Sequence, residues 1–294
     1  MTKNYLKFWG TRGSCSVSGP EYARFGGNTC TLELRYDGSA LIFDAGTGIR
    51  ALGVELLEQN IRDIHLFLSH SHWDHFIGIP FFEPIYTPGV HITIWAPPNI
   101  RRSYRELVSD LLSPEFFPVR LEQVKADLEF KTIQQKTPVA LGGVILDFHS
   151  TQHPGLTYSF KIKTPEATFG YITDNEMLLG HHGDFSEIPE ETLQAHQSFI
   201  DFFSDSDVLI HEAQYTPEEY LHKVGWGHSS SQNALYLIEK IRPKKWLVTH
   251  HDPSHTDLDL QNLEERTKKL LKERNIDCKA MWIQDGFIYP IKIE

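Results

Sequence analysis

The segment SHSHWDHFIG, which begins at Ser69, concentrates side chains that bind metal ions. His70, His72, Asp74 and His75 fall within six positions. Two ligands of one ion stand four apart on a helix, whereas a separation of two fits a loop that leaves a strand. Four ligands are too many for one ion with an open catalytic position, so the segment predicts two ions. A polar surface loop is the alternative, because the chain has 16 histidines.

Two ions need further ligands from elsewhere in the chain. His153, Asp174 and His250 each stand at or just after the end of an apolar run that is typical of a strand, where the loops of a sheet converge. Imidazole and carboxylate ligands without thiolate favour zinc, with manganese or iron as alternatives. The three cysteines are widely spaced and odd in number, so they indicate neither a disulfide framework nor a Cys-x-x-Cys metal site; they are Cys15, Cys30 and Cys278.

Strand and helix patterns indicate how these residues are positioned. Asp37-Gly38 predicts a hairpin turn, and the run IHLFLS (64–69) predicts a strand buried on both faces that leads into the histidine-rich segment. Ser229 to Ser231 are N-cap candidates for a helix. Further strands are expected in 91–97, 144–150, 157–162, 167–174, 207–213 and 245–250, a final Asp-Gly hairpin in 280–293, and helices in 103–112, 190–203, 230–241 and 258–275.

Strands first, then strands alternating with helices, predict an α/β fold in one domain over residues 1–294. The less regular stretch 76–130, rich in proline and aromatic residues, is interpreted as a lid or a dimer contact, or equally as a loop packed on its own core. No run approaches the 18 or so apolar residues of a membrane span. The N-terminus lacks the apolar stretch of a signal peptide, so we expect a cytoplasmic protein without a membrane partner.

The formal net charge of −11 bears on the choice of partner. A protein that grips a long polyphosphate backbone usually has a basic surface, because counterion release drives that affinity. An acidic chain is a poor candidate for binding a large nucleic acid. The charge therefore favours a small substrate.

The segment HSHWDH, followed in order by His153, Asp174 and His250, resembles the metallo-β-lactamase-fold hydrolases, from FWGTRGS near the start to VTHHDP. The resemblance implies an αββα sandwich of two mixed β-sheets flanked by helices, with a dinuclear metal site between the sheets. It also implies which side chains bind each ion: one metal is held by His70, His72 and His153, the other by Asp74, His75 and His250, with Asp174 bridging.

Later segments resemble one branch of that family. LIHEAQYT, GWGHSSSQNA and LVTHHDP are similar to phosphodiesterases related to ribonuclease Z, in which the counterpart of His228 donates a proton and that of Glu212 helps to orient it. GTRGS and GGNT are closer to small-nucleotide members, including the anti-Pycsar cyclic-nucleotide phosphodiesterases. His75 is atypical of zinc β-lactamases, and His72 is not the Glu of the redox di-iron branch. The long basic arm with which ribonuclease Z grips tRNA is not recognisable.

The resemblance and the acidic charge together predict a homodimeric phosphodiesterase with two divalent ions per chain, Zn²⁺ or else Mn²⁺. The expected reaction opens a 3′,5′-cyclic nucleotide to the nucleoside monophosphate. Asp74 would bind metal and steer the nucleophile's proton, and His228 would protonate the departing ribose oxygen. Asp44, in FDAGTG, is either a turn residue or a carboxylate that orients a ligand histidine.

The supporting residues also have non-catalytic interpretations. His228 could belong to a serine-capped helix start, and Glu212 could be an ordinary polar residue at a strand end. Three other functions share these motifs or part of them. They are an RNA 3′-end endonuclease like ribonuclease Z, a thioester or lactone hydrolase, and a non-catalytic nucleotide-binding regulator. The thioester hydrolases do not need the late histidine of GWGHSSSQNA, which argues against that choice.

Overall fold

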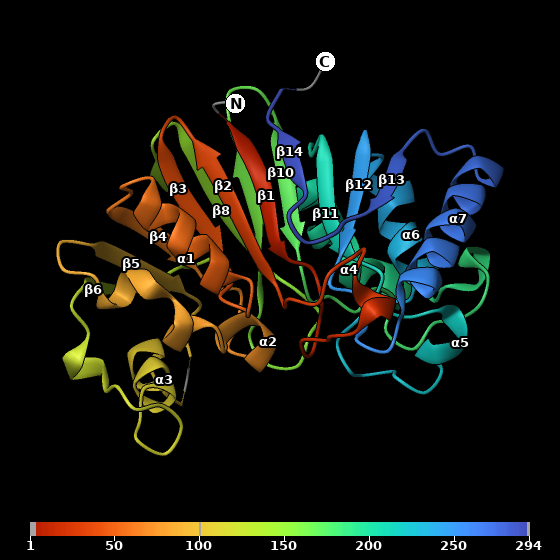
Figure 1. Cartoon of the computed structure of the whole chain (residues 1–294). Coiled ribbons are helices and arrows are strands. Elements are labelled where there is room, and N and C mark those ends of the chain that lie inside the picture. Colours follow the sequence, from red (N-terminus) through yellow and green to blue (C-terminus); the bar gives the residue numbers. More distant parts are fainter. Residues whose placement is uncertain (1–3, 100, 293–294) are drawn as a thin grey trace. The chain divides into compact units, whose positions relative to one another are not determined.

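A computed structural model describes residues 4–99 and 101–292 of the chain. These residues divide into two compact units, each built around its own β-sheet (Figure 1). Unit 1 contains the described residues up to Val17, Gly26–Gln134 and Gln284–Ile291, and unit 2 contains Ser18–Phe25, Gln135–Ile283 and Lys292.

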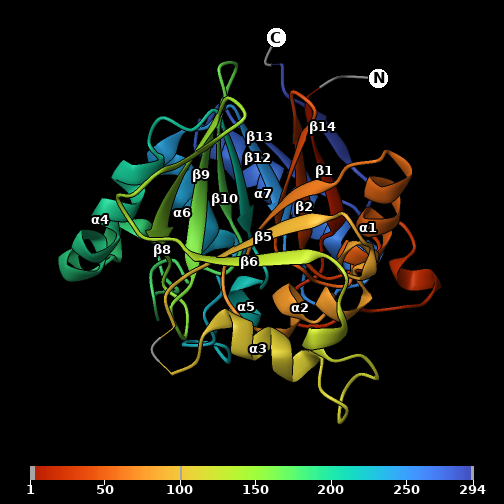
Figure 2. The same cartoon turned by 90° about the vertical axis from the view of Figure 1, so that its left-hand side faces the viewer.

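The sheet of unit 1 has seven strands of mixed direction. Four neighbouring strands in its second half run parallel to one another, and the others pair antiparallel. Figure 2 shows the last two strands side by side at one edge. In spatial order the strands are β14 (Ile288–Pro290), β1 (Tyr5–Gly10), β2 (Thr31–Tyr36), β3 (Ser39–Phe43), β4 (Asp63–Phe67), β5 (His91–Ala96) and β6 (Asp127–Thr132).

The predicted hairpin and the predicted buried strand are both confirmed in unit 1. Asp37 and Gly38 join β2 to β3 with φ angles of 46° and 85°, the positive pair that a tight mirror-image turn requires. Residues 64–67 of the run IHLFLS lie in β4, which lies between β3 and β5. The helices of this unit are α1 (Ile49–Glu58), α2 (Trp73–Phe76) and α3 (Tyr104–Leu111), with short 3-10 helices at Ile79–Phe81, Glu83–Tyr86 and Leu121–Gln123.

The sheet of unit 2 also has seven strands. The four strands of this sheet that come last in the chain are parallel to one another, and the three that come first in the chain pair antiparallel. In spatial order they are β13 (Lys279–Trp282), β12 (Lys245–Thr249), β11 (Val208–Glu212), β10 (Thr168–Ile172), β9 (Tyr158–Lys163), β8 (Val144–Ser150) and β7 (Val139–Leu141).

Helices flank this second sheet, and Figure 1 shows α6 (Ser231–Ile241) and α7 (Asp257–Glu273) beside β12 and β13. The Ser230 hydroxyl accepts a hydrogen bond from Asn233 N at 3.0 Å, which confirms a serine cap at the start of the third predicted helix. Trp246 is fully buried at the centre of the core between sheet and helices. The helices of the unit are α4 (Glu190–Phe203), α5 (Pro217–Tyr220), α6 (Ser231–Ile241) and α7 (Asp257–Glu273), with 3-10 turns at Pro20–Tyr22 and Phe185–Glu187.

The final hairpin predicted over 280–293 is wrong. β13 pairs with β12 in unit 2, whereas β14 pairs with β1 in unit 1. Asp285 anchors the connection instead of turning it back, because its carboxylate accepts hydrogen bonds from the Thr11 hydroxyl and from Asn28 N, both at 3.0 Å. An Asp-Gly pair thus marks a turn without saying which sheet the next strand joins.

The predicted class of two mixed β-sheets flanked by helices is confirmed. Strands β1, β6 and β7 and helix α1 were not expected from the sequence. The single domain over 1–294 and the lid or dimer contact at 76–130 stay predictions. Among the described residues, no helix combines the length and the apolar character needed to cross a membrane.

Candidate metal centre

In unit 1 the predicted site residues follow two neighbouring parallel strands. β3 ends one residue before Asp44, and β4 ends shortly before the loop that carries His70 and His72. Because the carboxyl ends of parallel strands meet at one edge of a sheet, these side chains converge. Asp74 and His75 follow on the short helix α2.

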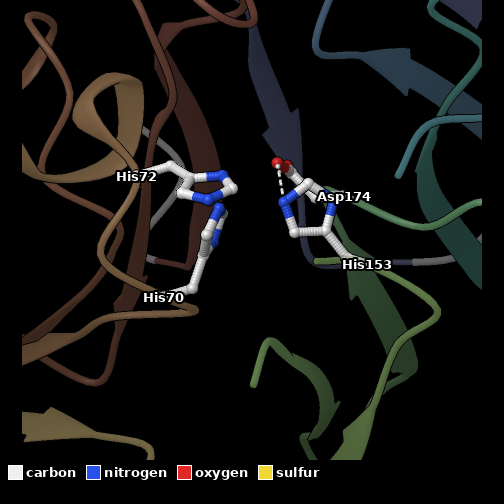
Figure 3. Close-up of side chains that lie close together, drawn as sticks. All are labelled: His70, His72, His153 and Asp174. Carbon is white, nitrogen blue, oxygen red and sulfur yellow. Dashed lines mark ion pairs between the residues drawn. The ribbon is translucent and has the colours of Figure 1, made fainter. Parts of the chain in front are cut away.

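The four predicted ligands of this segment lie together in unit 1. The ring centre of His70 is 4.4 Å from those of both His72 and His75, and Figure 3 shows the first pair. Nε2 of His75 lies 3.1 Å from Oδ2 of Asp74. Ser14 N donates a 2.7 Å hydrogen bond to the same carboxylate oxygen, so the GTRGS segment helps to place it. We refer to His70, His72, Asp74 and His75 as the unit 1 ligand set.

Asp44 connects the two strand ends beneath this set. Its Oδ2 accepts from Nδ1 of His75 at 2.9 Å, and its Oδ1 accepts from Ser69 N at 2.8 Å. The side chain is fully buried, and its backbone φ of 62° lies in the left-handed region that non-glycine residues rarely adopt. Such a costly conformation is typical of functional sites. The contacts support the predicted role of Asp44 in orienting a ligand histidine.

In unit 2 the predicted site residues follow or end four strands that run in the same direction. β8 and β10 both run antiparallel to β9, so they point the same way as β11 and β12. His153 follows β8, Asp174 follows β10, Glu212 ends β11 and His250 directly follows β12. The four side chains therefore meet at one edge of the sheet. We refer to His153, Asp174 and His250 as the unit 2 ligand set.

Hydrogen bonds fix the tautomers of the unit 2 histidines. Nδ1 of His153 lies 2.9 Å from the carbonyl oxygen of Gly227, and Nδ1 of His250 lies 2.9 Å from the side-chain oxygen of Gln214. Carbonyl oxygens only accept, so both Nδ1 atoms donate, and in the neutral rings both Nε2 atoms present lone pairs. These Nε2 atoms face Asp174, at 3.5 Å from Oδ2 for His153 (Figure 3) and 3.2 Å from Oδ1 for His250.

This arrangement tests whether the residues fit a metal. A lone pair that faces a carboxylate oxygen in a buried place is unfavourable, because neither atom can donate. A shared cation, whether a metal ion or a proton on the ring, resolves the conflict. The same pairing recurs in unit 1, where Asp44 fixes the Nδ1 proton of His75 and Nε2 faces Asp74. Both sets therefore fit a divalent cation such as Zn²⁺ or Mn²⁺.

Glu212 organises the neighbourhood of His228. It is fully buried and accepts from the backbone N–H groups of Ser229 at 2.9 Å and Gln214 at 3.0 Å. Burial raises the pKa of Glu212 well above its ordinary value, and the hydrogen bonds from Gln214 and Ser229 offset part of this effect. Nδ1 of His228 lies 3.5 Å from Oε1 of Glu212.

His228 also lies close to the unit 2 ligand set. Its ring stacks on that of His250 with centres 4.9 Å apart, and Asp174, His228 and His250 offer ligand atoms within 4.8 Å of one another. This group could bind a metal ion. His228 is therefore placed to act either on a metal or beside one.

The family profile described as "Beta-lactamase superfamily domain" matches residues 40–251, which include every residue of both ligand sets. This chain belongs to the beta-lactamase superfamily.

Several superfamily members are similar to the chain over most of its length. A ribonuclease Z from Haloarcula marismortui is 23% identical over an alignment of 255 positions, which covers 76% of this chain and 80% of the relative. The metallo-beta-lactamase fold protein YhfI from Bacillus subtilis has a TM-score of 0.67 at 16% identity, covering 97% of this chain and 98% of its own. Unliganded yeast PDE1 has a TM-score of 0.67 at 14% identity, covering 98% and 100%.

These comparisons confirm the predicted family and the enzyme class. The chain is a superfamily hydrolase of the metal-dependent kind that includes phosphodiesterases and ribonuclease Z-like enzymes. The metal and the substrate of this member are matters for proposal.

Sequence reasoning missed residues that support the ligands of this superfamily site. Gln214 holds His250, and Ser14 holds Asp74 through a backbone N–H that any residue type supplies. His251, beside a ligand, is engaged elsewhere, because its Nε2 lies 2.7 Å from the carbonyl oxygen of Ile283. The only sequence signal for Gln214 is its place two residues after Glu212.

Replacing Asp44 by alanine is expected to loosen metal binding about 10- to 100-fold, as loss of a carboxylate behind a ligand histidine usually does. The ring of His75 would lose the acceptor that fixes its Nδ1 proton. Competition with a chromogenic chelator measures the affinity. Asp63→Ala, at an exposed position on β4, is the matched control. Equal affinities in the two variants would show that Asp44 is only a turn residue.

A separate ion pair, between Glu219 on α5 and His255, predicts that the stability of the protein depends on pH. Burial alone would raise the pKa of Glu219, but hydrogen bonds from His255 and Thr216 lower it to about 2. Burial alone would lower the pKa of His255, but Glu219 and the nearby carboxylates of Asp252 and Asp259 raise it. The side chains lie 2.9 Å apart, and that of Glu219 is 39% exposed.

The sign of the effect follows from these directions. A raised His255 pKa contributes stability below its unfolded value of about 6.5, which is lost as the pH rises through the folded value. The lowered Glu219 pKa contributes stability that is lost as the pH falls from about 4.5 toward about 2. Glu219→Gln should cost about 1 kcal/mol near pH 5.5, and less near pH 9. Urea unfolding at both values measures this, and a cost that grows with pH would contradict it.

Proposed function

We propose that this chain is a dinuclear-metal phosphodiesterase that opens a small nucleotide diester, a 3′,5′-cyclic nucleotide in the first place, to the nucleoside monophosphate. The observation that carries the proposal is the repeated pairing of a histidine lone pair with a buried carboxylate at His75, His153 and His250. A divalent cation held between the imidazole nitrogen and the carboxylate makes that pairing favourable at all three places. His228 and Glu212 add the acid that a phosphodiester leaving group needs.

The ligand assignment is part of the proposal. A divalent pair would supply hydroxide at neutral pH and positive charge against the phosphoryl oxygens. Support comes from the family, from the order of the motifs and from the geometry within each unit. One ion would be held by His70, His72 and His153 and the other by Asp74, His75 and His250, with Asp174 bridging.

The chain's own residues would move the protons. Glu212 lies beside Nδ1 of His228, so Nε2 is the atom from which a proton would pass to the departing ribose oxygen. Glu212 also holds Ser229, the next residue, and so limits where the imidazole can go. Asp74, held by Ser14 N, would bind metal and steer the nucleophile's proton.

A small substrate agrees with the net charge of −11, which disfavours a long polyanion. A second candidate is an RNA 3′-end endonuclease, favoured by the similarity to a ribonuclease Z over 76% of the chain. A non-catalytic nucleotide-binding regulator is a third possibility. The presence of all seven proposed ligands argues against it, because a regulator has no need to keep them.

A substrate panel tests the function. It contains 3′,5′- and 2′,3′-cyclic mononucleotides, bis(p-nitrophenyl) phosphate and a precursor tRNA, each with Zn²⁺ and with Mn²⁺. We expect the 3′,5′-cyclic nucleotides to have the highest kcat/KM and to yield monophosphates. Cleavage of the precursor tRNA without turnover of cyclic nucleotides would show the nuclease instead. Binding of nucleotides without turnover of any substrate would show the regulator.

The assembly and location of the protein are proposals as well. We propose a cytoplasmic homodimer, with residues 76–130 as the lid or dimer contact. Phe81 and Phe116 in that stretch are 56% and 73% exposed, more than large apolar side chains usually are. Light scattering after size exclusion gives the mass. A monomer at all concentrations would rule out the dimer.

A further inference from the structure

The loop that carries His228 has no regular secondary structure to hold it. Residues 221–229 form turns and bends between α5 and α6. Gly225 and Gly227 have φ angles of 83° and 91°, in the left-handed region that favours glycine. Two glycines this close would leave the loop many conformations, so other contacts must select one.

Glu176 supplies those contacts from the ligand edge of the sheet. It stands two residues after Asp174 and is only 2% exposed. Its Oε1 accepts from Gly225 N at 2.8 Å and from the Tyr220 hydroxyl at 2.7 Å, and its Oε2 accepts from Gly227 N at 2.9 Å. One side chain therefore fixes the loop backbone on both sides of position 226.

The same loop positions a ligand of the metal centre. Gly227 donates its N–H to Glu176 and accepts from Nδ1 of His153 through its carbonyl oxygen. The approach is close, since a Cβ at Gly227 would lie 2.1 Å from that Nδ1 atom. His228 is the next residue. The position of Gly227 thus determines both the orientation of the His153 ring and the backbone position of His228.

The neighbouring contacts complete this connection. Asn175 O accepts from the Ser229 hydroxyl at 2.6 Å, and the hydroxyl accepts from Met177 N at 2.9 Å. The loop is therefore held before His228 by Glu176 and after it by Glu212 and by the chain that follows Asp174. Of these supports, Glu176 alone reaches the two glycines.

We propose that Glu176 is a positioning residue that couples the His153 ligand and the His228 acid through the backbone of Gly225 and Gly227. It touches neither metal nor substrate. Its effect on metal binding follows from the hydrogen bonds to the loop, whereas its effect on leaving-group protonation rests on the proposed function.

Glu176→Gln is the first test, because it keeps the size of the side chain but replaces one accepting oxygen by an NH₂ group that cannot accept from a backbone N–H. Hydrogen exchange of the loop peptide should speed up about tenfold or more, and metal affinity should fall about tenfold. kcat for a diester with a poor leaving group should fall about 10- to 100-fold. Turnover of bis(p-nitrophenyl) phosphate should fall much less, because its leaving group departs without a proton.

Matched variants separate positioning from a general loss of structure. Glu106→Gln makes the same chemical change away from the loop, at an exposed carboxylate that accepts from a backbone N–H at the start of α3. It should change none of the readouts. If Glu176→Gln does not fold, Glu176→Asp retains the charge but is too short to reach both glycines, and the same pattern is expected.

With metal at saturating concentration, the double variant Glu176→Gln/His228→Ala should be no slower on the poor substrate than His228→Ala alone. Additive losses, or equal losses on both diesters, would overturn the link to His228. Unchanged loop exchange and metal affinity in a folded Glu176→Gln protein would overturn the proposal as a whole. Those two measurements need no substrate, so failure of the proposed phosphodiesterase activity would be recognised separately.

Discussion

Asp174→Ala is expected to lose both metal ions and to lower kcat/KM by at least about 10³-fold. Its two carboxylate oxygens face Nε2 of His153 and Nε2 of His250 from a position that is only 1% exposed. A bridging carboxylate belongs to both ions, so its loss should weaken both. Metal charge stabilises a phosphoryl transition state by several kcal/mol, and each 1.4 kcal/mol or so is a factor of ten in rate.

Metal analysis and kinetics of the purified variant measure the two parts of this prediction. Asp147→Ala, on β8 of the same sheet, is the matched control, because that carboxylate pairs only loosely with Lys163 at 3.4 Å. The control should keep about two ions per chain and nearly full activity. Retention of two ions and of kcat/KM within fivefold in Asp174→Ala would remove Asp174 from the centre.

His228→Ala should keep both ions and yet lose about 10²- to 10⁴-fold in turnover of diesters with poor leaving groups, the range that general acids contribute. Nδ1 of His228 lies 3.5 Å from Oε1 of Glu212, so under the proposed mechanism Nε2 would offer the proton. A p-nitrophenolate group leaves without protonation, so bis(p-nitrophenyl) phosphate should be affected far less. This selectivity distinguishes an acid from a ligand.

The alternative role for His228 is that of a metal ligand, because Asp174, His228 and His250 form a group that could bind a metal. If His228 is a ligand, the alanine variant should lose an ion and slow on all diesters alike. The exposed His182→Ala serves as the control for loss of a histidine in general. Equal turnover of His228→Ala and wild type on a poor leaving group would exclude both roles.

The sequence predicted which residues would lie together best where the pattern was local or lay at a strand end. The unit 1 set falls within six residues, and the unit 2 set follows apolar runs that do form β8, β10 and β12. Parallel strands bring such positions to one edge whatever their separation along the chain. The assignment of each histidine to one ion came from the family resemblance.

The supporting contacts could not be predicted, because they depend on tertiary structure. Glu176 has the sequence appearance of an ordinary loop carboxylate, and its role follows only from where Gly225 and Gly227 lie. Pairing between distant strands is equally invisible, so the Asp-Gly pair near the end of the chain suggested a hairpin that does not form. Helix α1 begins at Ile49, and its N-cap residue Gly48 has no side chain to cap it, which removed the usual signal.

Anomalous diffraction at the zinc edge from crystals of the zinc-loaded protein tests the central claim most directly. We predict two peaks per chain, each about 2.0–2.2 Å from its ligands, with Nε2 of His75, His153 and His250 and the carboxylate of Asp174 among them. No peak, or peaks on surface histidines with His153, Asp174 or His250 turned elsewhere, would contradict a dinuclear hydrolase.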